Sequence, residues 1–267
     1  MDYYVVDVFT SQLFGGNPAG VCLLDEWLPD QLLQDIAIEN KHAETAFLVK
    51  AQRGYHLRWF TPHNEIDLCG HATMASGFVI LEFLEPEASK VSFDTLSGRL
   101  SVQRGQDGLL WMDLPAHPVT PAPVYACLPE ALGVPIMEVL SAIDLLIVLE
   151  SEAAVQSLAP DFKLLMENGG EPAIPSDNFG FIVTAAGTDC DFVSRYFVPH
   201  YDIPEDPVTG RAHTMLTPYW AERLGKDELT ARQLSARGGQ LRCQNAGPRV
   251  KLGGKVQLYL SGTLHLS

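Results

Sequence analysis

Two turns that lie far apart in the chain carry residues suited to binding a small carboxylate. The first contains Cys69-Gly70-His71, and the second contains Thr209-Gly210-Arg211. In each turn a glycine precedes an apolar segment with helical spacing. The N–H groups in the first turn of a helix are unpaired donors at the positive end of its dipole. Two such helix starts can hold a carboxylate without a basic cluster, although both glycines could equally be simple helix caps.

A third candidate is Glu44, which stands at the entry of a strand-like run, Thr45–Val49. A carboxylate at the end of a strand ordinarily faces water. Placed against a substrate carbon, the same group could act as a general base. A carbon next to a carboxylate loses its proton only if the developing negative charge is stabilised, and amides at a helix end supply that stabilisation.

The two turns belong to a longer internal repeat. Self-similarity over a long period indicates duplicated structure, although a chance recurrence in two strand-to-turn connections is the alternative. The repeat predicts two pseudo-symmetric α+β domains with a ligand site between them. At one constant offset, Arg58, Phe60, Pro62, His63 and Ile66 recur as Arg195, Phe197, Pro199, His200 and Ile203, and Gly70 recurs as Gly210 three residues further along.

The elements that must position these residues follow from hydrophobic periodicity and turn signals. The proline-rich segment 115–123 predicts a linker, and hence domains at 1–118 and 119–267 whose last strand could cross back to the first domain. Strands are expected at 3–9, 21–24, 44–49, 55–60, 91–94, 98–102, 109–114, 144–149, 178–184, 192–197, 241–243, 250–252 and 256–260, and helices at 29–40, 72–85, 128–132, 136–140, 150–167 with a break at Pro160, and 212–224.

Composition excludes several classes of function. The 267 residues carry a formal charge of -15, which would repel a phosphate backbone, so nucleic acid is not expected as a partner. No apolar run is long enough for a membrane span, and the first nine residues alternate like a strand rather than a signal peptide, which predicts a cytoplasmic protein. Five separated cysteines without a C-x-x-C pair predict neither a disulfide framework nor a zinc site.

Four motifs together resemble the PhzF family, the phenazine biosynthesis-like isomerases, which have the diaminopimelate epimerase-like fold. They occur in the order of that family and span nearly the whole chain. The motifs are Asp7-Val8-Phe9 with Gly16-Asn17-Pro18-Ala19, Glu44-Thr45-Ala46-Phe47, Phe60-Thr61-Pro62 through Cys69-Gly70-His71-Ala72-Thr73, and Glu205-Asp206-Pro207-Val208-Thr209-Gly210.

The resemblance implies two domains, each with a curved, mostly antiparallel sheet wrapped around a central helix. It also implies a homodimer and an isomerase or epimerase that moves a proton between carbons of a small carboxylate, without metal or cofactor. Glu44 matches the catalytic general acid/base, and His71 and Asp206 match residues that assist it. The substrate-binding positions that the resemblance implies are Asn17, Cys69, Gly70, His71, Gly210 and Arg211.

Two positions depart from the family pattern. Arg211 stands where a small residue is usual, so its guanidinium is expected to pair with Asp206 or Glu205, or to anchor a substrate carboxylate. Cys69 matches a catalytic cysteine of amino-acid racemases, but its counterpart is Thr209, so a mechanism with two thiols lacks one of them. A cysteine-based racemase or dehydratase, and an inactive homologue that binds a small molecule, therefore stay as alternatives. By position alone, His71 also fits a helix cap and Asp206 an ordinary turn residue.

Overall fold

A computed structural model describes residues 1–167, 174, 180–199 and 203–266 of the chain. The chain forms two compact units, one made of Met1–Leu114 with Lys251–Ser267 and the other of Pro115–Val250. As a division into domains, the ranges 1–118 and 119–267 stay a prediction. Within the described part of the chain, no helix combines the length and the apolar character needed to cross a membrane.

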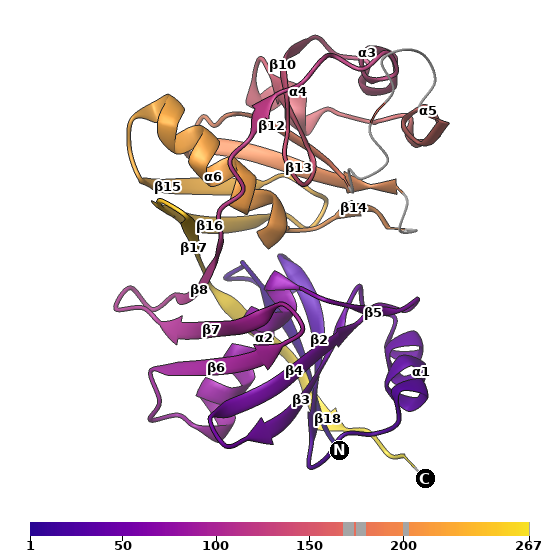
Figure 1. Ribbon diagram of the computed structural model, residues 1–267, viewed down its shortest axis with the longest axis vertical. Coiled ribbons are helices and arrows are strands. Elements are labelled where there is room, and N and C mark those ends of the chain that lie inside the picture. Colours follow the sequence, from indigo (N-terminus) through magenta and orange to yellow (C-terminus); the bar gives the residue numbers. More distant parts are fainter. Residues whose placement is uncertain (168–173, 175–179, 200–202, 267) are drawn as a thin grey trace. The chain divides into compact units, whose positions relative to one another are not determined.

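The first unit consists mainly of strands, with two α-helices of different character (Figure 1). Helix α1 is amphipathic and packs one face on the sheet, whereas nearly every residue of α2 is buried. The elements are β1 (Asp2–Val8), β2 (Asn17–Leu24), α1 (Asp30–Asn40), β3 (Thr45–Ala51), β4 (Gly54–Phe60), β5 (Glu65–Ile66), α2 (Gly70–Val79), a π-helical turn (Ile80–Leu84), β6 (Lys90–Thr95), β7 (Gly98–Arg104), β8 (Leu110–Pro115) and β18 (Val256–Thr263).

Strands enclose α2 on several sides. A helix that is buried all round must be covered all round, and α2 contacts β1, β2, β3 and β7. The approach to β7 is close, because a Cβ atom added at Gly77 would lie 2.5 Å from the side chain of Val102. Antiparallel pairs join β1 to β2 and to β18, while β2 and β3 are parallel. The start of α2 is therefore fixed within a rigid shell.

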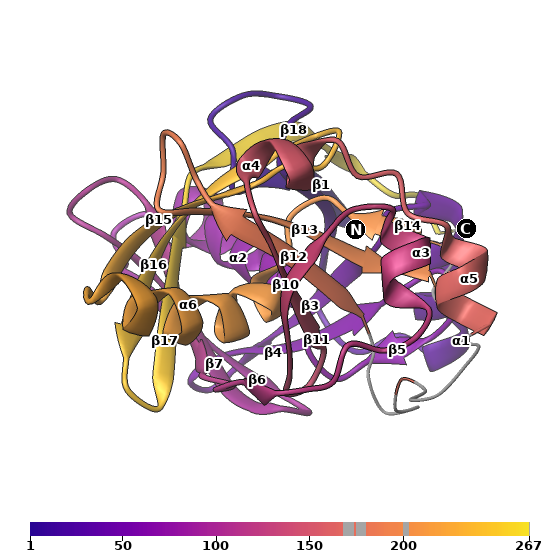
Figure 2. The same ribbon diagram turned by 90° about the horizontal axis from the view of Figure 1, so that it is seen from above.

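The second unit follows the same plan around α6, which lies along β15 and β16 (Figure 2). Its elements are β9 (Thr120–Pro121), α3 (Leu128–Leu132), β10 (Ile136–Ser141), β11 (Leu145–Leu149), α4 (Glu152–Gln156), α5 (Phe162–Glu167), β12 (Phe181–Ala186), β13 (Phe192–Val198), β14 (Ile203–Asp206), α6 (Gly210–Leu224), β15 (Glu228–Gln233), β16 (Gly239–Ala246) and β17 (Arg249–Gly254), whose last residues belong to the first unit.

Strand pairing in the two units has the same order. In the first unit β2 and β3 are parallel, β3 and β4 antiparallel, β4 and β6 parallel, and β6 and β7 antiparallel. The corresponding pairs in the second unit are β11 with β12, β12 with β13, β13 with β15, and β15 with β16, with the same alternation. The predicted α+β architecture with pseudo-symmetric halves is confirmed.

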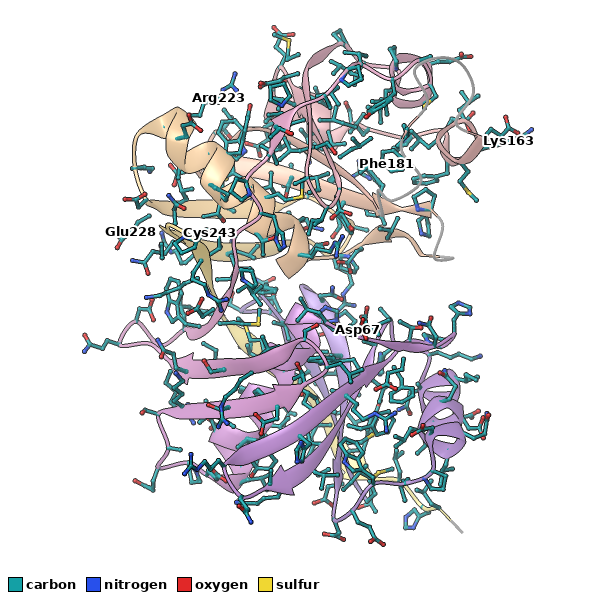
Figure 3. The ribbon with its side chains drawn as sticks, in the orientation of Figure 1. Asp67, Lys163, Phe181, Arg223, Glu228 and Cys243 are labelled. Atoms are coloured by element: carbon teal, nitrogen blue, oxygen red, sulfur yellow. The ribbon has the colours of Figure 1, made fainter. Side chains whose placement is uncertain are left out.

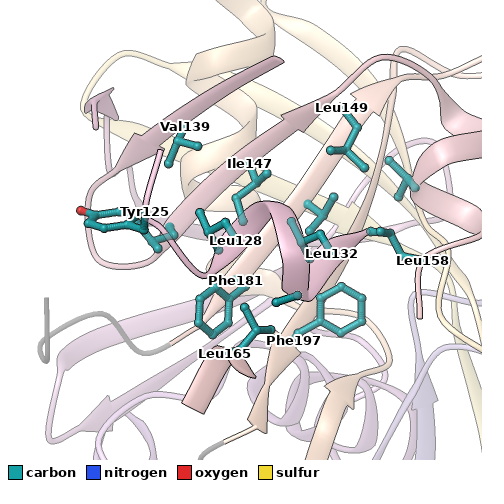
Figure 4. Packing of buried hydrophobic residues seen from close by; sticks show 14 of the residues in the cluster. Tyr125, Leu128, Leu132, Val139, Ile147, Leu149, Leu158, Leu165, Phe181 and Phe197 are labelled. Atoms are coloured by element: carbon teal, nitrogen blue, oxygen red, sulfur yellow. The ribbon is translucent and has the colours of Figure 1, made fainter. Parts of the chain in front are cut away.

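The apolar core on one side of the second sheet is closed by short helices (Figure 4). Leu128 and Leu132 of α3 and Leu165 of α5 are buried against the sheet residues Ile147 and Phe197. The core that supports the β12–β13 pair therefore comes from residues spread along more than sixty positions of chain.

The secondary structure differs from the prediction in several places. The expected helix at 136–140 is wrong, because this segment is β10, held by antiparallel pairing to β11 and to β9. Its apolar residues fit helical spacing, but tertiary pairing decided the conformation. Strand β15 was not predicted, and β2 begins at Asn17 instead of Val21. His200 and the expected start of a strand at 178 lie outside the described residues.

Candidate functional site

Each turn that leads to a central helix is braced by the same arginine–glutamate pair. Arg58 donates from Nε and a terminal nitrogen to Glu65, both at 2.7 Å, and Arg195 binds Glu205 in the same way at 2.7 and 2.9 Å. Each guanidinium also lies over a phenylalanine ring two residues later in its own strand. Bidentate charge-assisted bonds of this kind are specific in direction as well as strong. They fix the path of each turn.

The register of these strands corrects one part of the predicted repeat. Ile66 pairs with Trp59, and its counterpart opposite Tyr196 is Asp206. Ile203 pairs with Val198, beyond a register shift at which β14 skips one residue, Pro204. The predicted match of Ile66 with Ile203 is therefore wrong. Asp206 occupies a ladder position that holds an aliphatic residue in the first unit.

In the first unit, the structure places Glu44 next to His71. Glu44 immediately precedes β3, and its carbonyl accepts a hydrogen bond of 3.2 Å from Gly20 N–H. Its Oε2 lies 3.2 Å from His71 Nε2, with the two side chains only 18% and 6% exposed. The angles do not meet those of a hydrogen bond, and neither atom has another hydrogen-bond partner among the described residues. Both polar atoms are therefore buried without a hydrogen bond from the described residues.

The other nitrogen of His71 faces Asn17 and Cys69. Asn17 Nδ2 lies 3.2 Å from His71 Nδ1, and Cys69 Sγ lies 3.5 Å from the same nitrogen. Nε2 is thus the ring nitrogen that faces Glu44. Asn17, predicted to bind substrate, is fully buried behind the histidine and orients it.

The protonation of this group follows from burial and from mutual charge. Burial by itself lowers the pKa of His71, but the negative charges of Cys69 and Glu44 outweigh it and hold that pKa well above its ordinary value. Burial also raises the pKa of the Cys69 thiol, and Glu44 raises it further. Since this keeps the thiol protonated near neutral pH, Glu44 is the charge that favours the imidazolium there. Cys69 fits a buried thiol rather than a reactive thiolate.

Glu44, Cys69 and His71 also carry ligand types that bind metal ions, with ligand atoms within 4.8 Å of one another. The thiol approaches Nδ1 of the ring and the carboxylate approaches Nε2. An ion bound through one ring nitrogen would require one of these two groups to move. The contacts fit a chain of polar groups along the imidazole better than the shell of a single ion.

Gly70 begins α2, as predicted. The helix cap is Cys69 with an extended backbone and no side-chain capping bond, and Thr73 N–H donates to the Cys69 carbonyl at 3.1 Å. The N–H groups of Gly70 and His71 precede this first intrahelical bond, so helix geometry leaves them without a partner in the helix. These two N–H groups lie in the same turn as the His71 side chain. Asp67, labelled in Figure 3, lies in the same turn.

In the second unit, Gly210 begins α6 and Asp206 lies four residues before it. Thr209, the N-cap, donates its hydroxyl to Asp206 Oδ2 in a short hydrogen bond. The Thr209 backbone N–H donates to Oε1 of Gln233 at 2.9 Å. The predicted residues of this turn are therefore held in one hydrogen-bonded group that includes a residue from β15.

The guanidinium of Arg211 is paired with Asp144, which the sequence did not suggest. Arg211 Nε donates to Asp144 Oδ2 at 2.9 Å, and a terminal nitrogen donates to the Ile143 carbonyl at 3.1 Å. The expected partners, Asp206 or Glu205, are corrected accordingly, and Glu205 binds Arg195 instead. Asp144 is completely buried and also accepts from Gly180 N–H at 3.0 Å.

Gly180 is the counterpart of Glu44. Thr45 and Phe181 occupy equivalent ladder positions, opposite Phe60 and Phe197, and the residue before each is Glu44 or Gly180. A Cβ atom at Gly180 would lie 2.6 Å from the hydroxyl of Tyr196, so no side chain fits there without rearrangement. The carboxylate–imidazole pair of the first unit thus has no equivalent in the second.

Two residues of the second site were missed from the sequence. Asp144 reads as a turn residue before an apolar strand, and its partner is 67 positions away. Gln233 closes a strand whose buried positions Leu229, Ala231 and Gln233 alternate. This alternation could have identified Gln233 from the sequence. A polar residue at a position that alternates with buried apolar ones is itself expected to be buried and hydrogen-bonded.

His213, in the first full turn of α6, predicts a dependence of stability on pH. It is fully buried, and its Nδ1 contacts the Thr209 carbonyl at 2.7 Å. Burial lowers its pKa from 6.5 to about 4, although the bond to Thr209 opposes this change. Because the unfolded state binds the proton first, stability present above pH 6.5 is lost as the pH falls toward 4, by about 3 kcal/mol in all.

The comparison is between the wild type and His213→Gln. Free energies of unfolding measured in urea from pH 7 to 4 should fall more steeply for the wild type. Curves that stay parallel over this range would contradict the assignment of a neutral, buried His213.

Comparison with known proteins gives one consistent result. Residues 6–262 match the family model for the phenazine biosynthesis-like proteins. An uncharacterised isomerase of Pseudomonas aeruginosa is 49% identical over 263 residues, 98% of either chain. The crystal structure of a PhzF-family protein of Enterococcus faecalis is 42% identical and covers 99% of both chains with a TM-score of 0.93. A hydroxyproline epimerase of Agrobacterium vitis, at 12% identity and a TM-score of 0.63, shares the fold.

Proposed function

The chain belongs to the phenazine biosynthesis-like (PhzF) family of isomerase-like enzymes, and we propose that it moves a proton between two carbons of a small carboxylate with Glu44 as general acid and base. The observation that carries this proposal is the buried contact of 3.2 Å between Glu44 Oε2 and His71 Nε2 at the start of α2. It joins a proton acceptor, a second proton-carrying group and unpaired helix amides in one place.

In the proposed reaction the N–H groups of Gly70 and His71 hold the substrate carboxylate at the positive end of α2. The Glu44 carboxylate takes a proton from one carbon, and the released electron pair delocalises toward the bound carboxylate. Glu44 then returns the proton to a different carbon, so the substrate gains and loses no atom. The amides stabilise the negative charge while it exists.

His71 is proposed to assist through its Nε2 proton. Nε2 faces Glu44, and Glu44 favours the imidazolium, in which Nε2 carries a proton. After Glu44 has taken the proton from one carbon and before it returns the proton to the other, a proton donor that faces Glu44 can share that proton with it. No metal or cofactor takes part in these steps as proposed. The homodimer and the cytoplasmic location predicted from the sequence stay predictions.

The proposal is tested by incubating the protein with small carboxylates and metabolite extracts in heavy water. Carbon-bound deuterium, detected by mass spectrometry and located by NMR, is the expected result. A homologue that only binds small molecules would bind a ligand and incorporate no deuterium, and that outcome would overturn the proposal.

Arg211 is proposed to influence which carboxylate is accepted, through its backbone N–H or its guanidinium. The guanidinium side chain is 38% exposed at the start of α6 while it binds Asp144. The variant Arg211→Ser is expected to change relative rates within a panel of carboxylates, because a bidentate donor recognises two carboxylate oxygens together. Unchanged relative rates would show that the guanidinium takes no part in selection.

A further inference from the structure

The side chain of Gln233 makes three hydrogen bonds to the turn that carries Asp206. Its Oε1 accepts from Thr209 N–H at 2.9 Å, and its Nε2 donates to the Asp206 carbonyl at 2.8 Å and to Thr209 Oγ1 at 3.2 Å. Gln233 is 1% exposed and Thr209 is 6% exposed. The two ends of one amide thus connect the end of β15 to the residues immediately before α6.

These bonds determine the direction of every proton in the group. The Thr209 N–H can only donate, so the amide oxygen of Gln233 must face it and the amide nitrogen must face Thr209 Oγ1. Since Oγ1 accepts from that nitrogen, its own proton is left to donate elsewhere. It points to Asp206 Oδ2, the acceptor in the short contact. Gln233 therefore makes Thr209 an obligatory donor to the Asp206 carboxylate.

The first unit lacks this arrangement although it has the same framework. Thr95 ends β6 and pairs with Gly98 as Gln233 ends β15 and pairs with Gly239. The Thr95 hydroxyl donates to the nearby Gly98 carbonyl, and among the described residues it forms no hydrogen bond with the turn before α2. The position of Asp206 is Ile66 there. The glutamine and the carboxylate occur together in one unit.

A serine two residues after Gln233, and its counterpart two residues after Thr95, make the same hydrogen bond in both units. This bond supports the turn, and comparison with it shows what the glutamine adds. Ser235 Oγ donates to the Pro207 carbonyl at 2.7 Å, and Ser97 Oγ donates to the Asp67 carbonyl at 2.8 Å. This serine bond holds the backbone of either turn, whether the ladder position before it is Ile66 or Asp206. The glutamine is the additional element in the unit whose ladder position holds the acid.

We propose that Gln233 is a positioning residue for Asp206, acting through the Thr209 hydroxyl, in the reaction proposed above. It holds Oδ2 as an acceptor and thereby fixes the rotamer of the carboxylate and keeps it ionised. This inference rests on the proposed function only where it takes Asp206 to assist turnover, the role that the family resemblance implies for this residue. The hydrogen-bond direction itself is a property of the protein without substrate.

The first experiment needs no substrate. In protein labelled with carbon-13 at the aspartate carboxyls, the Asp206 signal is titrated in the wild type, Gln233→Leu and Ser235→Ala. The charged and titratable groups around it among the described residues include Tyr196, which lies opposite Asp206 in β13, and the Arg195–Glu205 pair beside it in the ladder. Arg211 of α6 and Asp144, which immediately precedes β11, pair with each other and act on Tyr196. All these groups are the same in all three proteins, so differences report the altered bond.

The expected result is an Asp206 titration midpoint that moves to higher pH in Gln233→Leu and stays within experimental error in Ser235→Ala. Amide hydrogen exchange at Thr209 should accelerate in Gln233→Leu, because its acceptor is lost. An unchanged Asp206 midpoint in Gln233→Leu would overturn the inference, whatever the rate of turnover of this variant. The variant Thr209→Ser, which keeps the hydroxyl, should titrate like the wild type, and Thr209→Val like Gln233→Leu.

The second experiment measures coupling in the deuterium-exchange assay. Misplacement of a reacting group by about 1 Å costs on the order of 10²-fold in rate, so Gln233→Leu should lower kcat about 10- to 100-fold with KM little changed. In an Asp206→Asn background the same substitution should have no further effect on kcat. Additive losses would overturn the inference. If Asp206→Asn turned over like the wild type while Gln233→Leu still shifted the Asp206 midpoint, the role of Asp206 in turnover would be refuted. The hydrogen-bond inference would stand.

Discussion

Replacing Glu44 by Gln is expected to lower the rate of carbon-bound deuterium incorporation by about 10²- to 10⁴-fold, the contribution of a positioned general base. Glutamine has nearly the same shape, so the packing around β3 is preserved. Its amide cannot accept a proton from carbon, and it places either an oxygen or an N–H group opposite His71 Nε2. Substrate affinity should therefore change far less than turnover.

Glu228→Gln is the matched control for this variant. Glu228 is the first residue of β15 and is exposed, so it is also a carboxylate at the entry of a strand (Figure 3). It should keep the wild-type rate. A comparable loss in both variants would show that the assay reports net charge or folding instead of catalysis at Glu44.

The thiol alternative is tested by Cys69→Ala, with Cys243→Ala as a control for loss of a buried cysteine. Cys69 is 6% exposed and Cys243 is 2% exposed, and burial raises the pKa of both thiols. Both variants are expected to retain turnover within a few fold. If Cys69→Ala abolished exchange while Glu44→Gln did not, the general base would be the cysteine and the assignment made here would be wrong.

The repeat was predictable from the sequence because it lies in local patterns. The residues Arg58, Phe60 and Gly70 and their later counterparts are spaced by strand and turn geometry, and the structure places them equivalently in the two units. Ile203 was matched wrongly because a register shift in a strand leaves no mark in spacing alone. Only the ladder shows that Asp206 takes the place of Ile66.

The chemistry of the site was less accessible to sequence reasoning. Glu44 is 27 residues before His71, and nothing in either segment indicates their contact; the family resemblance alone pointed to it. Asp144 and Gln233 were missed because their partners are fixed by the packing of whole strands. A buried polar residue can be recognised in the phase of a strand, but its partner depends on long-range pairing.

Asp144→Ala is expected to lower the free energy of unfolding by about 1–3 kcal/mol, because Asp144 is completely buried while Arg211 is 38% exposed, so the main cost is a buried N–H left without its acceptor. Burial raises the pKa of Asp144 while Arg211 beside it acts in the opposite direction. Removal of the carboxylate leaves Gly180 N–H without its acceptor and Arg211 Nε without its partner. Asp144→Asn should cost less, because an amide oxygen can still accept from Gly180.

Asp94→Ala gives the comparison for an exposed pair. Asp94 binds Arg99 at 3.3 Å with the side chains 41% and 51% exposed, and such surface pairs contribute about 0–1 kcal/mol. Urea denaturation of the three variants at pH 7 should rank Asp144→Ala lowest and Asp94→Ala near the wild type. Equal losses in Asp144→Ala and Asp94→Ala would mean that Arg211 is not held by a buried charge. A large loss in Asp144→Ala alone would tie any role of Arg211 in selection to the stability of the second unit.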